Sequence, residues 1–343
     1  MRCSRFIRLL RLVPLILSLA VFGGTILQGR DLELRRLSPS AVMVSGGSQD
    51  VNLVAVDSGL GIVVVDTGAS GEEGGAARVL IEAAFPGKRF AYVINTHSHW
   101  DHISGNSAFP EALVVAHRKC RDSIIRKGEG SGTESLDLPA ASTPAEGLPA
   151  GENPDLPPPP PPVGTIWFED GKYSLTIPDI TFADSLTLHC GDRTFRLVYF
   201  GETHTVSDII VLVPEEKMLL VGDLFFNDWL PVFSEGIHPD PARWEQVRRI
   251  IDEDGGRIVT VIPGHGPLMD RAQLEKQFDY RLRLWDAVRL AAGEGRNLEE
   301  IEVELDLERM APELVPWNIR DSRGRSVHEG NVRAVYRLLA DPE

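Results

Sequence analysis

A cluster of histidine and aspartate residues is the most informative feature of the sequence. Residues 96–102 read Thr-His-Ser-His-Trp-Asp-His and so bring together four candidate metal ligands, which are His97, His99, Asp101 and His102. Four such groups in one short segment are typical of a metal site. His97 and His99 are two residues apart, so on an extended segment both can face the same way. Asp101 and His102 follow in a turn and can point elsewhere, so this one loop could serve two metal ions.

Three further candidate ligands occur downstream at the ends of apolar segments, and they are His204, Asp223 and His265. Gly222 and Gly264 directly precede the last two, and glycine lets a backbone approach a site closely or adopt a positive φ. Imidazole and carboxylate ligands without thiolate suit zinc, and iron or manganese are the alternatives. The other histidines are interpreted as structural or solvent-exposed, and they are His117, His189, His238 and His328.

These candidate ligands need strands to position them, because a strand end can present a side chain rigidly to a cleft. Apolar runs precede the histidine cluster and each later ligand, at Phe90–Asn95, Thr194–Phe200, Met218–Val221 and Arg257–Ile262. Turn residues indicate two hairpins, formed by Val51–Val56 with Gly61–Val65 and by Ile209–Val213 with Met218–Val221. Further strands are expected at Leu113–Ala116, Tyr173–Ile177 and Ser185–His189.

Helical segments alternate with these strands. Helices are expected at Glu72–Phe85, Ala242–Asp254, Arg271–Ala292, Asn297–Glu308 and Asn331–Leu339. The chain therefore has two β-rich halves, each interleaved with helices. This order predicts an α/β fold in which two sheets pack together with helices outside, a four-layer αββα sandwich.

The N-terminus has the layout of an export signal. Four arginines precede an apolar run of 16 residues from Leu12 to Leu27. A cationic segment followed by a short apolar one is typical of a secretory signal. The run is shorter than the roughly 20 residues that span a bilayer, and it could also remain as an uncleaved tether at residues 12–27. We expect residues 1–29 to be a signal peptide or N-terminal anchor of a periplasmic or secreted protein.

Residues 128–164 differ in composition from the rest of the chain. They are rich in Gly, Ser, Pro and Glu and contain six consecutive prolines, Pro157–Pro162. Such a stretch cannot pack into a core, which predicts an extended or disordered insertion. It is either a tolerated surface insertion or a flexible lid over the site. Residues 296–343 form the predicted C-terminal helical extension.

The overall composition excludes several classes of protein. The chain has 343 residues and a formal net charge of −15. This acidity argues against a nucleic-acid partner and against an anionic membrane surface, both of which require a basic face. Three cysteines are too few for a disulfide scaffold, and only Cys120 and Cys190 lie beyond the predicted signal. A small-molecule substrate remains as the expected partner, and the oligomeric state is left open.

The ligand pattern resembles that of the metallo-β-lactamase superfamily. His97-x-His99-x-Asp101-His102, followed by His204, Asp223 and His265, matches the motif set of that family. The resemblance covers roughly Leu34–Leu290, and we expect the corresponding domain at residues 34–295. The resemblance implies a four-layer αββα sandwich of the metallo-β-lactamase type. By position it also implies one ion on His97, His99 and His204, a second on Asp101, His102 and His265, and Asp223 between them.

Two further residues gain a role through the resemblance. Asp66 ends an early strand, as does an aspartate of the family that supports the histidine loop without binding an ion. Thr205, beside His204, is expected to support the ligands in a similar way. Family members often read His-Thr-Pro-Gly here, whereas this chain reads His204-Thr205-Val206-Ser207-Asp208. The ligand is kept although the loop around it differs.

The resemblance implies a dinuclear zinc hydrolase that uses a metal-bridging hydroxide to cleave an ester, thioester, lactone or amide-like bond. With the N-terminal signal, we expect this hydrolase to be exported. Asp101 would orient that hydroxide or carry its proton, and is the candidate catalytic residue. An aspartate at position 223 is typical of glyoxalase II-like hydrolases, whereas the zinc β-lactamases generally have Cys or Ser. Three different functions stay open, namely a β-lactamase, a mononuclear iron enzyme like the persulfide dioxygenases, and a non-catalytic metal-binding protein.

Candidate substrate contacts are aromatic. Trp100 lies inside the ligand loop, and Phe226 and Trp229 follow Asp223. Next to a metal site they could form an apolar wall. Core packing is the alternative interpretation for Phe226 and Trp229. Trp100 could equally have a structural role and hold the ligand loop in place.

Overall fold

The computed structural model describes residues 30–128, 165–167, 174–227, 229–233, 237, 240–253, 257–320 and 325–340. The predicted signal or anchor at residues 1–29 lies outside this part of the chain. So do residues 129–164 of the predicted insertion. Among the described residues, no helix combines the length and apolar character that crossing a membrane requires.

The first sheet has seven strands, in the spatial order β1 (Arg30–Arg36), β2 (Ala41–Gly47), β3 (Leu53–Asp57), β4 (Ile62–Val65), β5 (Phe90–Ile94), β6 (Leu113–His117) and β9 (Ile180–Phe182). The strands from β1 to β4 are antiparallel neighbours, whereas β4, β5, β6 and β9 run parallel. Val54 pairs with Val65, which confirms the first predicted hairpin.

The second sheet has five strands, in the order β10 (Ser185–Cys190), β11 (Arg193–Tyr199), β12 (Ile209–Val213), β13 (Met218–Gly222) and β14 (Thr260–Pro263). β12 and β13 form the second predicted hairpin, closed by the short 3-10 helix η2 (Pro214–Glu216). β14 then pairs parallel to β13. A separate small ladder joins β7 (Thr165–Trp167) to β8 (Ser174–Thr176).

The two sheets pack face to face through alternating apolar residues. Val54 and Val56 of the first sheet share one core cluster with Val211 and Val213 of the second. Successive strand side chains point to opposite faces, so the residues between them serve other layers. Ala55, for example, packs on the outer side of the first sheet. Ile210 and Leu212, on either side of Val211, likewise face outward, where the second sheet meets its own helices.

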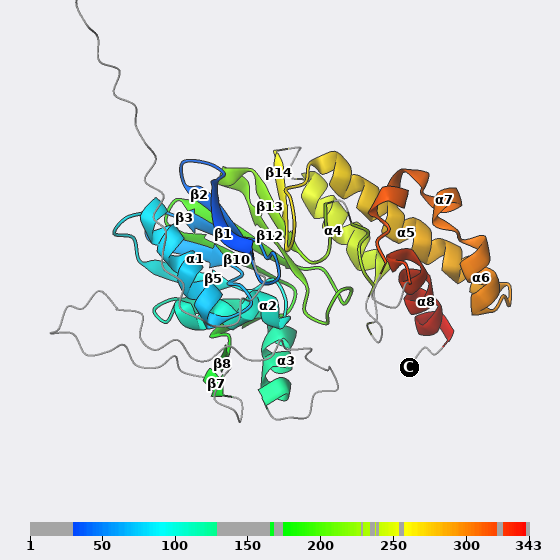
Figure 1. The fold of residues 1–343 in the computed structure, drawn as a ribbon, viewed down its shortest axis with the longest axis horizontal. Helices are drawn as coiled ribbons and strands as arrows, with labels where there is room; N and C mark the ends of the chain where they lie inside the picture. Colours follow the sequence, from blue (N-terminus) through cyan, green and yellow to red (C-terminus); the bar gives the residue numbers. More distant parts are fainter. Residues whose placement is uncertain are drawn as a thin grey trace, which may run out of the picture.

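Helices cover both outer faces. α1 (Gly71–Ala84) packs Ala77 and Ile81 against the first sheet. α4 (Pro241–Glu253) and α5 (Arg271–Gly293) pack Trp244, Phe278 and other apolar side chains against the second. Figure 1 shows α4 and α5 on the β14 side of the molecule. The fold is therefore a four-layer αββα sandwich, as predicted.

The remaining helices are α2 (Trp100–Ile103), η1 (Ser104–Ala108), α3 (Arg118–Gly128), α6 (Leu298–Glu304), α7 (Leu307–Met310), η3 (Pro312–Trp317) and α8 (Val327–Ala340). The predicted single helix Asn297–Glu308 is wrong, because α6 ends at Glu304 and a new helix, α7, begins at Leu307. The Asp306 side chain accepts a hydrogen bond from the Glu308 backbone N–H and so caps α7. Asp at this position favours a helix start over helix continuation.

Candidate metal centre

The candidate ligands meet at one edge of the sandwich because several strands end there. β4 leads to Asp66, and β5 leads to the loop with His97 and His99. In the second sheet, β11 lies two antiparallel steps from β13, and β14 runs parallel to β13. These three strands therefore point the same way, and His204, Asp223 and His265 follow their ends. A backbone hydrogen bond from Ile209 N–H to the Thr96 carbonyl, at 3.0 Å, joins the two sheets at this edge.

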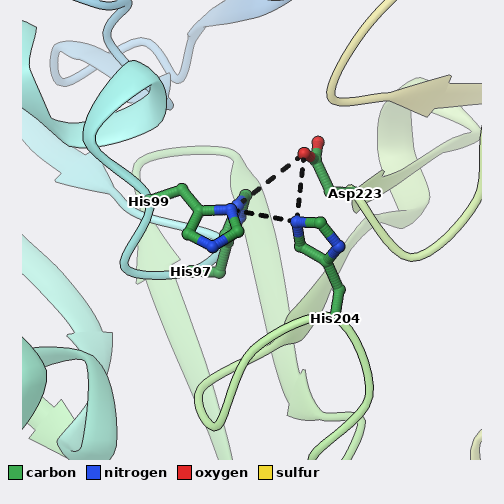
Figure 2. A group of neighbouring side chains, drawn as sticks. All are labelled: His97, His99, His204 and Asp223. Carbon is green, nitrogen blue, oxygen red and sulfur yellow. Dashed lines mark hydrogen bonds and ion pairs between the residues drawn. The ribbon is translucent and has the colours of Figure 1, made fainter. Parts of the chain in front are cut away.

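One group of ligand atoms comes from His97, His99, His204 and Asp223, all within 4.8 Å of one another (Figure 2). His204 Nε2 lies 3.0 Å from His99 Nδ1 and 3.4 Å from Asp223 Oδ2. His97 Nε2 lies 3.9 Å from the same Asp223 oxygen. The predicted first ligand set thus converges on one point together with Asp223.

A second group comprises Asp101, His102 and His265. His265 Nε2 lies 3.3 Å from Asp101 Oδ2 and 3.2 Å from His102 Nε2. Asp223 also reaches this group, since its Oδ1 is 3.3 Å from His102 Nε2 and its Oδ2 is 3.3 Å from His265 Nε2. Asp223 therefore lies between the two groups, as the sequence pattern predicts.

Hydrogen bonds on the far side of three imidazoles fix which nitrogen faces the centre. The Thr96 hydroxyl donates to Asp66 Oδ2 at 2.7 Å, so His97 Nδ1–H donates to the Thr96 oxygen at 3.0 Å. His102 Nδ1–H donates to Asp66 Oδ2 at 3.0 Å, and His265 Nδ1–H donates to the Gln49 carbonyl at 2.8 Å. In the neutral imidazole, which is the form that binds metal, each Nε2 then has its lone pair toward the site. Such partners orient metal-binding histidines and raise their basicity.

Asp66 lies against the histidine loop and contacts Thr96 and His102. It has a φ of 56°, in the left-handed region that aspartate tolerates better than most residues. This backbone turns its carboxylate toward the loop after β5, where it also accepts the Thr96 N–H at 2.9 Å. Thr205 supports the site differently, because its hydroxyl donates to Asp208 Oδ1 at 2.7 Å.

The side chains fit metal ions. His97 Nε2 is buried and makes no hydrogen bond within the described residues, which is costly for a polar atom unless something else binds it. A Cβ at Gly264 would lie 1.9 Å from Asp223 Oδ1, so only glycine leaves room for that carboxylate. The donors are nitrogen and oxygen, and both described cysteines, Cys120 and Cys190, are buried free thiols outside the two groups. This donor chemistry suits zinc.

The pKa values show how strongly the centre attracts positive charge. Burial lowers the pKa of His97 well below its ordinary value and that of His204 to about 3, so both are neutral at pH 7. Burial opposes ionisation of Asp223, but the charges of His102 and His265 hold its pKa well below the usual range. Burial likewise opposes protonation of His265, and the Asp223 charge outweighs it and raises the pKa to about 10. Metal binding to such a site displaces protons.

The predicted aromatic contacts divide between core and surface. Phe226 is 4% exposed, and its ring centre lies 6.3 Å from that of His265 and 5.7 Å from that of Trp229. Trp229 is 45% exposed. Trp100 begins α2 and is half-buried. Phe226 is therefore buried beside His265, and Trp229 packs on it and extends to the solvent.

Three buried polar residues near the site are not among the predicted ones. Asp208 accepts the backbone N–H groups of His204 and Thr205, each at 2.8 Å. Gln277 and Arg281 of α5 contact the segment after Asp223. A Thr-x-x-Asp spacing at positions 205–208 is a local signal for a turn of this kind. Gln277 and Arg281 lie on the apolar face of α5. A polar residue at an apolar position of the helix is the signal in the sequence that could have identified them.

Comparison with known proteins assigns the family. The sequence profile described as "Metallo-beta-lactamase superfamily" matches residues 46–265, which is more than half of the chain. The chain therefore belongs to the metallo-β-lactamase superfamily.

Individual relatives are distant. The alpha subunit of 2,4-dinitroanisole O-demethylase from Nocardioides sp. (strain JS1661) is 24% identical over 263 residues, covering 75% of this chain and 62% of that protein. The stereoselective inverting sec-alkylsulfatase Pisa1 from Pseudomonas sp. has a TM-score of 0.59 at 17% identity, covering 89% of this chain and 50% of that one. The metallo-β-lactamase from Pontibacter korlensis has a TM-score of 0.49 at 18% identity, with 72% and 97% covered. The chain spans only about half to three-fifths of the length of the first two.

Proposed function

We propose that this protein is an exported, dinuclear zinc-dependent hydrolase that cleaves an ester, thioester, lactone or amide-like bond in a small molecule. The observation that carries the proposal is the position of Asp223. Its carboxylate lies within 3.4 Å of His204 in one ligand group and within 3.3 Å of His102 and His265 in the other. A single carboxylate shared in this way suits two adjacent ions better than one.

The chain's own residues would divide the work as follows. Bound zinc ions would supply Lewis acidity and a water molecule with a lowered pKa. Asp101 is partly exposed and its pKa is about 2, because the His102 and His265 charges outweigh the effect of burial. As a carboxylate it can accept a hydrogen bond from the attacking water and fix its orientation. Phe226 and Trp229 would exclude water on one side of the substrate.

Substrates with an alkyl–oxygen bond form a second candidate class. Two of the relatives are named as an O-demethylase and a sec-alkylsulfatase. Both names concern a bond between an alkyl carbon and oxygen. An alkyl sulfate ester or an aryl alkyl ether is therefore the second candidate substrate class, after carboxylic esters and thioesters.

A β-lactamase, an iron dioxygenase and a non-catalytic protein would each give a different measurement. A β-lactamase would open a β-lactam ring, and Asp223 in place of Cys or Ser argues against it. A mononuclear iron dioxygenase would contain iron and consume oxygen. A non-catalytic protein would keep its function in His99→Ala, whereas a hydrolase would lose metal and rate together.

Export is proposed from the N-terminal sequence alone. The arginine-rich segment and the apolar run at residues 12–27 support a periplasmic or secreted protein, with a membrane tether if the segment stays uncleaved. Mass spectrometry of the mature protein from a membrane and a soluble fraction would test both outcomes.

A chromogenic substrate panel tests the hydrolase. Zinc-loaded protein from Arg30 onward would be offered ester, thioester, lactone, β-lactam, phosphodiester, alkyl sulfate and aryl ether substrates, with and without chelator. We expect one strong signal that disappears with chelator and in His99→Ala. Oxygen uptake by iron-loaded protein, with no hydrolysis by the zinc form, would overturn the proposal.

A further inference from the structure

A ladder of three polar side chains on α5 holds the segment that follows Asp223. Gln273, Gln277 and Arg281 are spaced by four residues and therefore share one face of the helix. Gln273 Nε2 donates to Asn227 Oδ1 at 2.6 Å. Gln277 accepts the Phe226 N–H at 3.2 Å and donates to the Phe226 carbonyl. Arg281 Nη2 donates to the Leu224 carbonyl.

Gln277 and Arg281 occupy positions of α5 where apolar residues would be expected. Gln277 and Arg281 are both 0% exposed, and their helix neighbours Leu274, Phe278 and Leu284 belong to the core. Burying a charged group is costly unless it is paired. Well-packed apolar residues often stabilise such a position better than ions do. Core stability therefore gives no reason for a guanidinium here.

The Arg281 guanidinium is held by aromatic rings more than by hydrogen bonds. Its central carbon lies 5.1 Å from the ring centres of Phe225 and Phe233 and 5.8 Å from that of Trp244. Its Nε and Nη1 atoms are buried and make no hydrogen bond to the described residues. Cation–π contacts with three rings fix the orientation of the group. That orientation aims Nη2 at the Leu224 carbonyl, one residue after Asp223.

We infer that Gln277 and Arg281 are positioning residues of the metal centre, which fix the segment carrying Asp223 from a helix beyond the residues matched by the family. The inference rests on the metal centre of the proposed function and not on its substrate. Residues 271–293 are thus part of the site although none of them touches an ion. Without the ladder, the Asp223 segment would keep its strand but lose the three anchors that set its direction.

The test compares variants of the full mature protein by metal binding. Arg281→Met and Gln277→Met keep side-chain volume and remove the polar contacts, whereas Arg281→Lys keeps the charge. Arg283→Met is the matched control, because Arg283 is exposed on the same helix and pairs with Glu313 at the surface. Zinc stoichiometry, competition with a chelator, the absorption spectrum of the Co²⁺ form and the unfolding midpoint of the metal-free form would be measured.

We expect Arg281→Met and Gln277→Met to fold with a metal-free unfolding midpoint at or above that of the parent. One of the two ions should bind about 10- to 100-fold more weakly, as for other residues that orient metal ligands, and the Co²⁺ spectrum should change. Arg281→Lys should recover part of the affinity, and Arg283→Met should match the parent in every readout.

Two results would overturn the inference. One is an unchanged metal affinity and Co²⁺ spectrum in folded Arg281→Met and Gln277→Met. The other is loss of folding in both variants, since the ladder would then be core structure only. Failure of the proposed function looks different, because the parent would then bind two ions and hydrolyse no substrate in the panel.

Discussion

Asp223 contacts four of the candidate histidine ligands, two from each group. The local sequence alone does not place one carboxylate in contact with both ligand groups. Two glycines that lie near Asp223 make this position possible. Gly222 has a φ of 50°, and a Cβ there would lie 2.8 Å from Thr96 Oγ1. Gly264 leaves the space that the Asp223 carboxylate occupies. The site therefore depends on the lack of a Cβ atom at Gly222 and Gly264 as well as on the ligands themselves.

Replacing Asp223 by asparagine should weaken metal binding with little change in the fold. The amide keeps the size of the side chain but removes the negative charge shared by both groups. We expect affinity for at least one ion to fall by more than about tenfold and hydrolysis to fall with it. Zinc content after dialysis checks the first effect. Asp286→Asn, an exposed position on α5, is the control and should keep both ions.

Replacing Gly264 by alanine should displace Asp223. The new Cβ would sit 1.9 Å from Asp223 Oδ1 and 2.9 Å from His102 Cε1, so the carboxylate must leave its place. We expect loss of zinc in both groups. Gly330→Ala is the control, because its Cβ meets nothing within 4 Å and alanine favours a helix. Full zinc content in Gly264→Ala would contradict the geometry described for this site.

Among the secondary-structure elements, β6 ends in a histidine that is used for structure and not for metal. His117 stacks on Tyr199 with ring centres 3.9 Å apart. Its Nε2–H donates to the Ala183 carbonyl at 2.7 Å, and its Nδ1 accepts the Lys119 N–H at 3.3 Å. Both nitrogens are therefore satisfied only in the neutral form. Burial accordingly lowers the pKa of His117 to about 4.

His117 should make the protein less stable in acid. Its pKa is below the unfolded value of about 6.5, so the unfolded chain binds the extra proton first. The stabilisation is present above about pH 6.5 and is lost as the pH falls toward about 4. Urea unfolding at pH 7 and pH 4.5, with chelator present, should show a smaller loss in His117→Gln than in the parent. An equal loss in both would contradict this assignment, and His189→Gln, at an exposed histidine of β10, should behave as the parent.

For the molecule as a whole, the metal centre lies across the seam between the two sheets. His97, His99 and His102 follow the first sheet, whereas His204, Asp223 and His265 follow the second. Backbone contacts also cross this seam, among them the hydrogen bond from the Asn52 N–H to the Gly264 carbonyl at 2.7 Å. Ions bound here would cross-link the two halves of the sandwich.

Removal of metal should therefore lower the unfolding temperature of the entire domain. An ion that binds only the folded chain adds about 2.7 kcal/mol when its free concentration is 100 times its dissociation constant. Calorimetry with and without chelator should show a fall in Tm that added zinc restores. In His99→Ala the effect of chelator should be smaller. A Tm that ignores chelator in protein shown to contain zinc would argue that the ions do not join the sheets.

Local patterns were sufficient for most of the elements, whereas the division of the ligands into two groups was implied by the resemblance to the family. Ile209–Val213 is a run of apolar and β-branched residues, and it forms β12 within those bounds. Such runs fit the pleated, buried surface of a sheet whatever surrounds them. The seven candidate ligands follow strand ends, and parallel strand ends meet at one edge. Their convergence could therefore be anticipated, although their metal-binding roles remain predictions, as do the domain boundaries.

Other features depend on contacts between residues far apart in the chain. β1 and β2 lie before the predicted strands and pair with each other and with β3. The α5 ladder joins positions 51 and 57 residues apart, at Gln277–Phe226 and Arg281–Leu224. A hydrogen bond between residues this far apart in the chain produces no periodic pattern in the sequence, because each partner alone is an ordinary residue. The packing of α5 on the second sheet brings these side chains to the backbone beside Asp223. Strand periodicity and ligand spacing, by contrast, can be recognised in the sequence because they depend on residues close together in the chain.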